Sequence, residues 1–520
     1  NYSHTFAQTH GLKAMIGFER KTGESMNFSA YRTYFASTLI DELFAGGDLD
    51  KTNTGSASHD ARINYFGRFN YDYSSKYLVE FVFRYDGSYI FPKGKQYGFF
   101  PSVSLGWVIS EENFWKEKLA FINSFKLRGS WGQTGNDRVS PYQYLASYGF
   151  DNSAAGNMHS PKDSKNTTVF DGNTEAKFLQ ELRIPNPSIT WEVANQSNVG
   201  FDLQTLNGSL RISVDYFHNI RSNILCYRNA SIPATAGLTL PRENIGKVKN
   251  QGFEFDIAYN NNIGDFTYQI GLNGGFSKSK IIFWDESPNI PDYQRATGKP
   301  INPSLIGDNS AGLYYEAIGI FKDETDLERY PHWQGAKPGD IIFRDVNGDN
   351  KIDGLDRVRS DKTNIPTLTG GLNIDLGYKD FYLTIGFQGA AGATRYHEVE
   401  SGEAGNFSME DLEGRWTPTN TNASKPRVGN YRSEYWNQTQ TGPNTYWNRK
   451  SDYIRLKNLE LGYNMPQKLY SKLGIESTRI YFSGMNLFTI CGMKTFDPET
   501  TSAVAYPLNK IYSIGLALTF

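Results

Sequence analysis

The sequence has no run of eighteen apolar residues, the length that a membrane-spanning helix needs. Its mean hydropathy of −0.53 is polar, which excludes a bundle of membrane helices. A membrane β-barrel is not excluded, because only every second residue of its strands faces lipid. Charge of one sign is lacking too, since 53 basic and 55 acidic residues give a formal net charge of −2. Bulk charge therefore indicates neither nucleic acid nor an acidic membrane surface as a partner.

Cysteine is scarce, and residues suited to metal or nucleophilic chemistry are scattered. The two cysteines, Cys226 and Cys491, lie far apart and outside any metal-binding spacing. We interpret them as unpaired structural residues, with a single disulfide as the alternative. The seven histidines form no cluster, and the sequence contains no nucleophile–base spacing, no phosphate-binding glycine loop and no zinc motif. The sequence therefore predicts that the protein is not an enzyme.

Aromatic residues and glycine, in contrast, are abundant. Aromatic residues make up 15% of the chain, with 33 Tyr and 34 Phe, and there are 50 glycines. This many rings would supply the two interfacial girdles of a membrane barrel. Many of the glycines fall on the polar face of predicted strands, where they would reduce crowding inside a barrel.

The last ten residues, from Ile511 to Phe520, alternate strictly between large apolar and small or polar side chains. A period of two indicates a strand whose two faces meet different media. A length of about nine to eleven residues is that of a tilted strand that crosses a bilayer. The alternative is the final strand of a soluble sandwich. We expect this closing strand to face lipid through Tyr512, Ile514, Leu516, Leu518 and Phe520.

The same alternation recurs along the chain in about fifteen strands, with charged residues between the apolar ones, as in a water-filled lumen. Short turns are predicted at Ser74-Ser75, Asn207-Gly208 and Lys379-Asp380. Long polar loops are predicted at residues 20–60, 135–185, 282–362 and 390–450. Short turns that alternate with long loops favour an all-β fold, a transmembrane antiparallel β-barrel with long extracellular loops, over a soluble sandwich or a propeller.

One segment of the 282–362 stretch, DVNGDNKIDGLD, has the spacing of a calcium-binding loop. Its candidate ligands are Asp345, Asn347, Asp349, the backbone carbonyl of Lys351, Asp353 and Asp356. Ligands that are all oxygen favour Ca²⁺ in a structural role. The segment has Asn350 where such loops have glycine, and Asp356 is shorter than the usual glutamate. The alternative is an acidic, solvated turn that holds no ion.

Several segments together resemble the SusC/RagA family of TonB-dependent outer-membrane transporters. They occur in the family's order over nearly the whole chain. The segments are FFPSVSLGWVISEENFW (99–115), KLRGSWGQTGN (126–136), NPSITWEVANQSNVGFDL (186–203), NIGKVKNQGFEFDI (244–257), GIFKDETDL (319–327), PGDIIFRDVNGDNKIDGLDR (338–357), RWTP (415–418), DYIRLKNLELGYNMP (452–466) and the closing NLFTI, FDPE and IYSIGLALTF.

The resemblance implies a location in the outer membrane of a Gram-negative bacterium and a barrel of about 22 strands around a plug domain. Residues 1–520 would form the C-terminal part of that barrel, with the calcium-type loop in the excursion at 282–362. The plug domain and the N-terminal strands are expected to be absent from this chain. The partners implied are a SusD-like lipoprotein, outer-membrane lipid, and the TonB complex, reached through the missing N-terminal part. No nucleic acid is expected.

The resemblance also implies a function, which is active TonB-dependent import of large nutrients such as oligosaccharides or peptides. A receptor for metal chelates or vitamins on the same barrel is one alternative. A passive porin or a surface adhesin is another, and the sequence before Asn1 would discriminate, because a passive pore has no plug. No motif identifies the residues that bind substrate.

Overall fold

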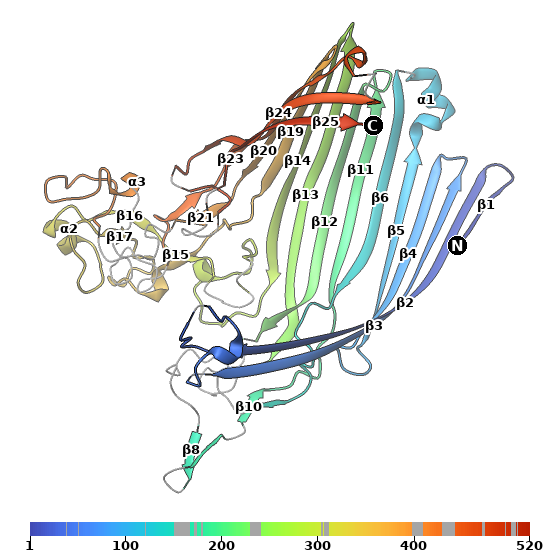
Figure 1. Cartoon of the computed structure of the whole chain (residues 1–520). Coiled ribbons are helices and arrows are strands. Elements are labelled where there is room, and N and C mark those ends of the chain that lie inside the picture. The colour runs from blue at the N-terminus through green and yellow to red at the C-terminus, as the bar shows by residue number, and fades with distance from the viewer. Residues whose placement is uncertain are drawn as a thin grey trace.

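The computed structural model describes the chain except for residues 38, 50, 120, 150–166, 171–173, 178–179, 229–240, 303–304, 306–310, 398–408, 429–442, 471–473, 495, 501–505 and 507. Its main element is one 15-stranded antiparallel sheet in which the strands follow one another in chain order (Figure 1). The strands are β1 (Tyr2–Phe6), β2 (His10–Tyr31), β3 (Thr52–Tyr73), β4 (Tyr77–Ser88), β5 (Tyr97–Val108), β6 (Ile122–Asn136), β11 (Glu192–Thr205), β12 (Leu210–Tyr227), β13 (Arg242–Ile263), β14 (Phe266–Phe283), β19 (Leu368–Tyr378), β20 (Phe381–Ala391), β23 (Tyr453–Asn464), β24 (Ser477–Cys491) and β25 (Ile511–Thr519).

The remaining elements are short and lie in the connections. Five two-stranded sheets pair β7 (Ser147–Gly149) with β10 (Gln180–Arg183), β8 (Thr167–Phe170) with β9 (Thr174–Lys177), β15 (Leu313–Tyr315) with β18 (Arg357–Arg359), β16 (Ala317–Ile320) with β17 (Ile341–Phe343), and β21 (Thr394–Tyr396) with β22 (Asn448–Lys450). The α-helices are α1 (Asn113–Lys118), α2 (Glu324–Arg329) and α3 (Met409–Leu412). Among the described residues, no helix has both the length and the apolar character to cross a membrane.

Short and long connections alternate along the sheet, and the short turns gather at the end where α1 lies (Figure 1). The predicted short turns are confirmed, since residues 74–76, 206–209 and 379–380 connect β3 to β4, β11 to β12 and β19 to β20. Ser74 and Ser75 both have positive φ angles, of 52° and 55°, as do Asn207 and Gly208, at 55° and 86°. Positive φ angles at consecutive residues let the chain reverse within these loops of three and four residues. Asn and Gly adopt this conformation with little strain, so the local sequence sets the hairpin register.

The prediction of a loop at residues 20–60 was wrong. Strands β2 and β3 pair without interruption from His10 opposite Tyr73 to Tyr31 opposite Thr52, and only residues 32–51 connect them. The outer half of this hairpin carries Ser, Thr and Gly on both faces, so the apolar alternation is missing there. Met26 and Phe28 of β2 share one face there, but only Ala57 and Gly55 of β3 lie opposite them. Backbone hydrogen bonds continue the pairing, and periodicity alone does not reveal such a segment.

The closing strand matches the expected limits and has the expected alternation. The side chains of Tyr512, Ile514, Leu516, Leu518 and Phe520 are all exposed, with Ile514 at 83%. In the ladder, Leu516 lies opposite Ile480 and Ile514 lies opposite Phe482, so that neighbouring strands present apolar side chains on the same face. An apolar face that is this exposed on so long a sheet indicates contact with lipid.

The closing strand offers a matched test of the two faces. We expect Leu516→Arg to lower the amount of protein assembled in the membrane, because an arginine on the lipid side near the midplane costs about 2–4 kcal/mol. Ser513→Arg places the same charge on the other face of β25, opposite Ser483, and should assemble normally. Membrane yields are measured after fractionation of cells that make the full-length protein. Equal yields of the two variants would contradict the assignment of faces.

Candidate functional site: the polar face and the loop excursion

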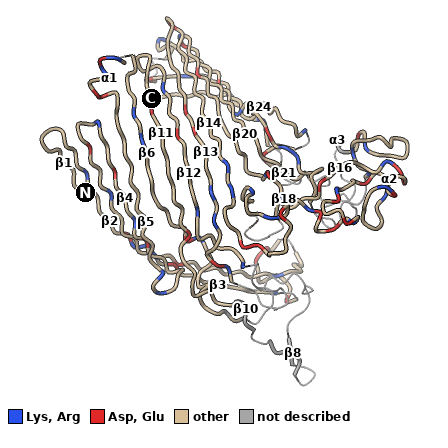
Figure 2. Tube along the Cα trace, turned by 180° about the vertical axis from the view of Figure 1, so that it is seen from behind, with Lys and Arg blue, Asp and Glu red and all other residues tan. Residues whose placement is uncertain are grey.

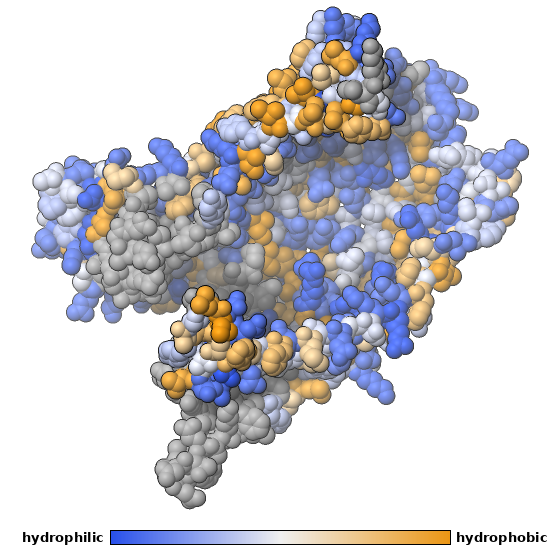
Figure 3. All heavy atoms as spheres, in the orientation of Figure 1, coloured by the Kyte–Doolittle hydropathy of each residue, from blue (hydrophilic) through white to orange (hydrophobic). Residues whose placement is uncertain are grey.

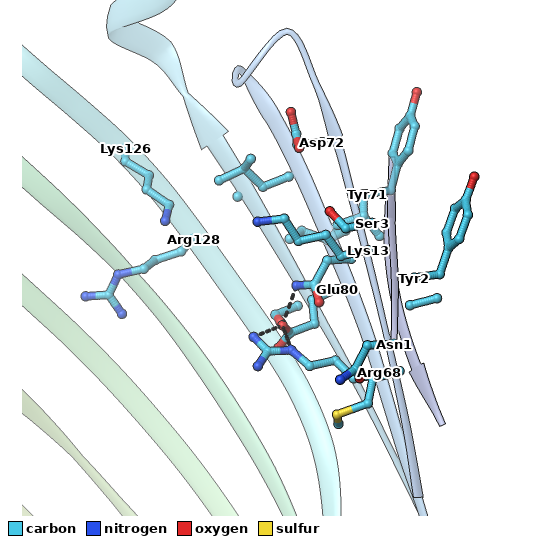
Figure 4. A pocket seen from close by; sticks show the side chains of 18 residues that line it. Asn1, Tyr2, Ser3, Lys13, Arg68, Tyr71, Asp72, Glu80, Lys126 and Arg128 are labelled. Atoms are coloured by element: carbon cyan, nitrogen blue, oxygen red, sulfur yellow. Dashed lines mark hydrogen bonds and ion pairs between the residues drawn. The ribbon is translucent and has the colours of Figure 1, made fainter. Parts of the chain in front are cut away.

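One face of the sheet collects polar and charged side chains. In Figure 4, Lys13, Lys126 and Arg128 extend to one side of the strands, whereas Tyr2 and Tyr71 extend to the other. Charged residues are spread along the strands and are not confined to their ends (Figure 2). A hollow of about 840 Å³ lies against the charged side near β1. We call this side the polar face and the opposite side the apolar face, and the space-filling view shows hydrophilic residues across the hollowed part of the molecule (Figure 3).

Arg128 on β6 is the centre of an ion-pair cluster on the polar face. Its Nε lies 3.0 Å from Oδ2 of Asp202 on β11, and its Nη2 lies 2.8 Å from Oδ2 of Asp215 on β12. The hydroxyl of Ser213 accepts a hydrogen bond from Nη2 at 2.9 Å and donates one to Asp202 at 2.8 Å. Lys126 lies opposite Asp202 in the ladder and adds a second positive charge. Strand β6 and the β11–β12 hairpin, which are distant in sequence, therefore contribute to one charged cluster.

A second ion pair lies closer to the N-terminal edge of the sheet. Arg68 on β3 donates from Nε to Oε2 of Glu80 on β4 at 2.6 Å, and Asn70 donates to the same oxygen at 2.6 Å (Figure 4). Partly exposed ion pairs contribute little to stability. The ion pair of Arg68 and Glu80 instead presents paired charges to any molecule beside the polar face.

Arg455 on β23 anchors the segment that follows β24. Its side chain is only 1% exposed, and its guanidinium pairs with Asp497 and Glu499 and donates to Thr489 at 2.9 Å. The side chain of Arg395 donates to the backbone carbonyl of Pro498 at 2.8 Å. Both segments are among the family motifs, and the sequence alone indicates no role for them. An arginine inside an apolar strand and two acidic residues after the next strand were the available signal.

The long loops form a folded unit with a core of their own. Tyr315, Ile341, Phe343, Ile352 and Trp447 are buried together, which joins the excursion after β14 to the segment before β23. Asp340, which is fully buried, pairs with Arg427 at 2.7 Å. The sequence predicts two separate polar loops at residues 282–362 and 390–450. Their apolar residues are too widely spaced to show a period, so only the tertiary structure reveals the shared core.

The acidic loop at residues 345–356 adopts the sharp turn that a calcium loop requires. Asn350 has a φ angle of 62°, the left-handed conformation expected at the position where such loops have glycine. The carboxylate of Asp345 accepts backbone N–H groups from Gly348 at 2.7 Å and Asn350 at 2.8 Å. Asp349 accepts from the N–H of Lys351 at 2.9 Å. These bonds hold the first half of the loop in a compact turn.

The second half of the loop is less suited to an ion. Both carboxylate oxygens of Asp356, which is fully buried, accept backbone N–H groups at 2.8 Å, from Val346 and from Asp353. Asp353 caps the short 3-10 helix at Gly354–Asp356. In the part of the chain that the structure describes, no group of three or more His, Cys, Asp or Glu side chains is arranged to hold a metal ion. The calcium site therefore stays a prediction.

The acidic loop nevertheless concentrates negative charge. Burial raises the pKa of the neighbouring Tyr293 hydroxyl, and the charges of Asp356, Asp353, Asp349 and Asp345 raise it further. The Tyr293 hydroxyl donates to the carbonyl of Leu355 at 2.8 Å, which fixes the ring against the loop. A cation near this loop would reduce the mutual repulsion of its carboxylates.

Comparisons with known proteins agree with this architecture. The family model described as "TonB dependent receptor-like, beta-barrel" matches residues 1–487. TonB-dependent receptor P3 of Formosa agariphila is 30% identical over 512 residues, which cover 96% of this chain and 48% of that protein. TonB-dependent receptor SusC of Bacteroides thetaiotaomicron is 27% identical and covers 90% of this chain and 45% of its own length. The solved RagAB peptide transporter matches the whole chain, and 54% of its own, with a TM-score of 0.78 and 21% identity.

The antiparallel sheet, its two faces and these matches define a transmembrane β-barrel of the bacterial outer membrane. The chain belongs to the family of TonB-dependent receptor β-barrels. It spans about half the length of the curated relatives that it matches. In such a barrel the apolar face meets lipid and the polar face lines the lumen.

The acidic loop yields a test for calcium. We expect purified full-length protein to bind Ca²⁺ and Asp349→Ala to abolish that binding, because the substitution removes a central oxygen ligand. Asp361→Ala is the control, since Asp361 is an exposed acidic residue that pairs with Lys299 outside the loop. Calorimetric titration with calcium chloride provides the measurement. Heats that are equal in Asp349→Ala and the wild type, or no heat in the wild type, would leave the acidic-turn interpretation standing.

The Arg128 cluster yields a test of stability. We expect Arg128→Ala to lower the thermal unfolding midpoint by a small amount, because Asp202 and Asp215 lose an ion-pair partner and each of these partly exposed pairs contributes at most about 1 kcal/mol. Adding Asp215→Asn should recover part of the loss. Arg211→Ala is the matched control, since within the described residues Arg211 makes no ion pair. Unfolding midpoints that fall equally for the variant at 128 and the variant at 211 would show that the cluster has no special role.

Proposed function

We propose that the chain is the barrel portion of an active importer that carries large nutrients, oligosaccharides or peptides, across the outer membrane with energy supplied through TonB. The observation that carries this proposal is the family match over residues 1–487. A polar face with paired charges and a hollow beside it suits passage of hydrated solutes, whereas an apolar lumen would not.

A surface lipoprotein of the SusD type is the partner that we propose for the mouth. The similarity to SusC and to the RagAB peptide transporter supports this choice. The folded unit around Tyr315 and Trp447 offers a preformed platform, because its core and the Asp340–Arg427 ion pair order the long loops before any partner arrives. A preordered surface lowers the entropy cost of docking.

Loss of TonB provides the direct test of active import. We expect cells that express the full-length protein to accumulate labelled oligosaccharides or peptides, and expect inactivation of TonB to reduce that uptake to the level of cells without the protein. Energised transport requires the inner-membrane partner, whereas a passive porin does not. Uptake is measured with the same cells and substrates in both backgrounds. Uptake that persists without TonB would favour the porin, and uptake of iron chelates alone would favour the metal-chelate receptor.

A further inference from the structure

Four lysines lie on the apolar face of the sheet, at the loop end of two neighbouring strands. The ladder between these strands pairs Phe253 of β13 with Phe276 of β14, and their exposed rings lie 5.7 Å apart on the apolar face. Toward the loops, the same regular ladder continues to Lys249 opposite Lys280. Every second residue shares a face, so these lysines extend to the same side as the two rings. We call the four residues the lysine patch, which consists of Lys247, Lys249, Lys278 and Lys280.

The residues that alternate with the lysines point to the other side of the wall. Val248 and Ile281 are buried in an apolar core together with residues of the loop excursion. The hydroxyl of Ser279 accepts a hydrogen bond from the backbone N–H of Ile301 at 3.1 Å. The lysine patch therefore faces away from the lumen, and a plug domain inside the barrel would not cover it. Both strands are also inner members of the sheet, so strands added at the edges of the sheet would not cover it either.

The patch begins where the apolar band of the sheet ends. On β14, the exposed side chains of Phe266, Ile270, Leu272 and Phe276 follow one another on the apolar face. Residues 266–276 have the length of about nine to eleven residues that crosses a bilayer. The Phe253–Phe276 pair stands at the loop end of this stretch, where a barrel carries one of its aromatic girdles. The next side chains on this face of β14, those of Lys278 and Lys280, are therefore at the level of the lipid headgroups of the outer leaflet.

The positive charge of the patch is not balanced by protein. Lys249 and Lys280 are directly opposite each other, and like charges in this position destabilise a sheet. Across the residues that the structure describes, none of the four lysines forms an ion pair. The neighbouring strand β12 contributes His218 and Ile220 to this face, opposite Gln251 and Lys249, and neither carries a negative charge. An anion between Lys249 and Lys280 would convert this repulsion into attraction.

The surroundings of the patch favour an amphiphilic anion over a soluble one. A lysine side chain can lie along an apolar surface while its ammonium group reaches the headgroup region, where it binds phosphate as a point charge. A free anion would contact the ammonium groups alone. A phosphorylated lipid would in addition lay its acyl chains against Phe253 and Phe276, which border the patch on the side of the membrane.

We propose that the lysine patch is a binding site for a phosphorylated lipid of the outer leaflet. Lys249 and Lys280 share one phosphate group, Lys278 adds a third charge, and the acyl chains lie along the Phe253–Phe276 pair. The bound lipid removes the repulsion between the lysines and holds the loop end of β13 and β14 at a defined height in the membrane. This inference goes beyond import, because the site is on the outside of the barrel and is independent of the substrate.

The test measures lipid binding by purified full-length protein in detergent. The probes are lipid A, which is a phosphorylated glycolipid, the same glycolipid after removal of its phosphates, and inorganic phosphate. We expect the wild type to bind lipid A, and Lys249→Gln combined with Lys280→Gln to weaken that binding about tenfold. Arginine at both positions should keep the affinity, because the charge is kept. Native mass spectrometry reports the fraction of protein that carries lipid at each lipid concentration.

The matched control removes two lysines from the opposite end of the sheet. Lys118→Gln combined with Lys468→Gln changes the net charge equally, and both lysines are exposed at the end where the short turns gather. This control variant should bind lipid A as the wild type does. A loss of affinity as large as that of the variant at 249 and 280 would show that only net charge matters and would overturn the site.

Four further results would contradict the inference. They are a wild type that binds no lipid A, equal affinity of the wild type and the variant at 249 and 280, equal affinity for the glycolipid with and without phosphates, and inorganic phosphate bound as tightly as lipid A. If the double variant does not assemble, Lys278→Gln takes its place, and unchanged affinity in that variant is the contrary result. None of these results bears on import, which the comparison of cells with and without TonB tests separately.

Discussion

The hydrogen-bond ladder between neighbouring strands is the constraint on which the rest of this structure depends. Hydrocarbon offers no partner to a backbone N–H or C=O, so each membrane strand must pair along its length with its neighbours. Here the ladder runs in chain order from β1 to β25, with every neighbour antiparallel. Once pairing sets the register, the period of two in each strand assigns every side chain to lipid or to lumen.

That register also determines the chemistry of the lumen. Arg128 and its two acidic partners are 74 and 87 residues apart in sequence, yet they meet because β6, β11 and β12 pair in one particular alignment. A slip of one residue would turn Arg128 toward lipid and separate it from both carboxylates. The charged cluster therefore opposes misalignment, in addition to whatever it contributes to solute passage. The same alignment gathers Gln196, Asn219 and Asn250 into one row.

The extracellular side is built on a different principle. Its long connections bury aromatic and aliphatic residues around Tyr315 and Trp447 and tie the segment after β24 to Arg455. Such loops have a core and ion pairs of their own, so they present a defined surface at the mouth of the barrel. Because this order is present before anything binds, the loops would dock a partner at a lower entropy cost than disordered loops would.

The elements that sequence reasoning predicted correctly are those whose cause is local. The alternation from Ile511 to Phe520 and the Asn207-Gly208 turn need only neighbouring residues, and the acidic loop shows its turn at Asn350. The family and the outer-membrane location followed from motifs spread along the chain. The outer part of the β2–β3 hairpin was missed, because residues 52–60 of β3 carry no apolar period, although the backbone ladder continues.

Only the tertiary structure determined the contacts between segments that are distant in sequence. The neighbouring order of the strands and their register determine the burial of Arg455 beside Asp497 and Glu499, the shared core of the loops, and the row of Gln196, Asn219 and Asn250. The period of a single strand predicts that a residue faces the lumen, but it does not predict which residue of the neighbouring strand lies opposite. The sequence by itself therefore determined the class of fold and the two faces of the sheet, because periodicity is a property of one segment. The pairing of strands determined the sites on the lumen face, because register is a property of two segments.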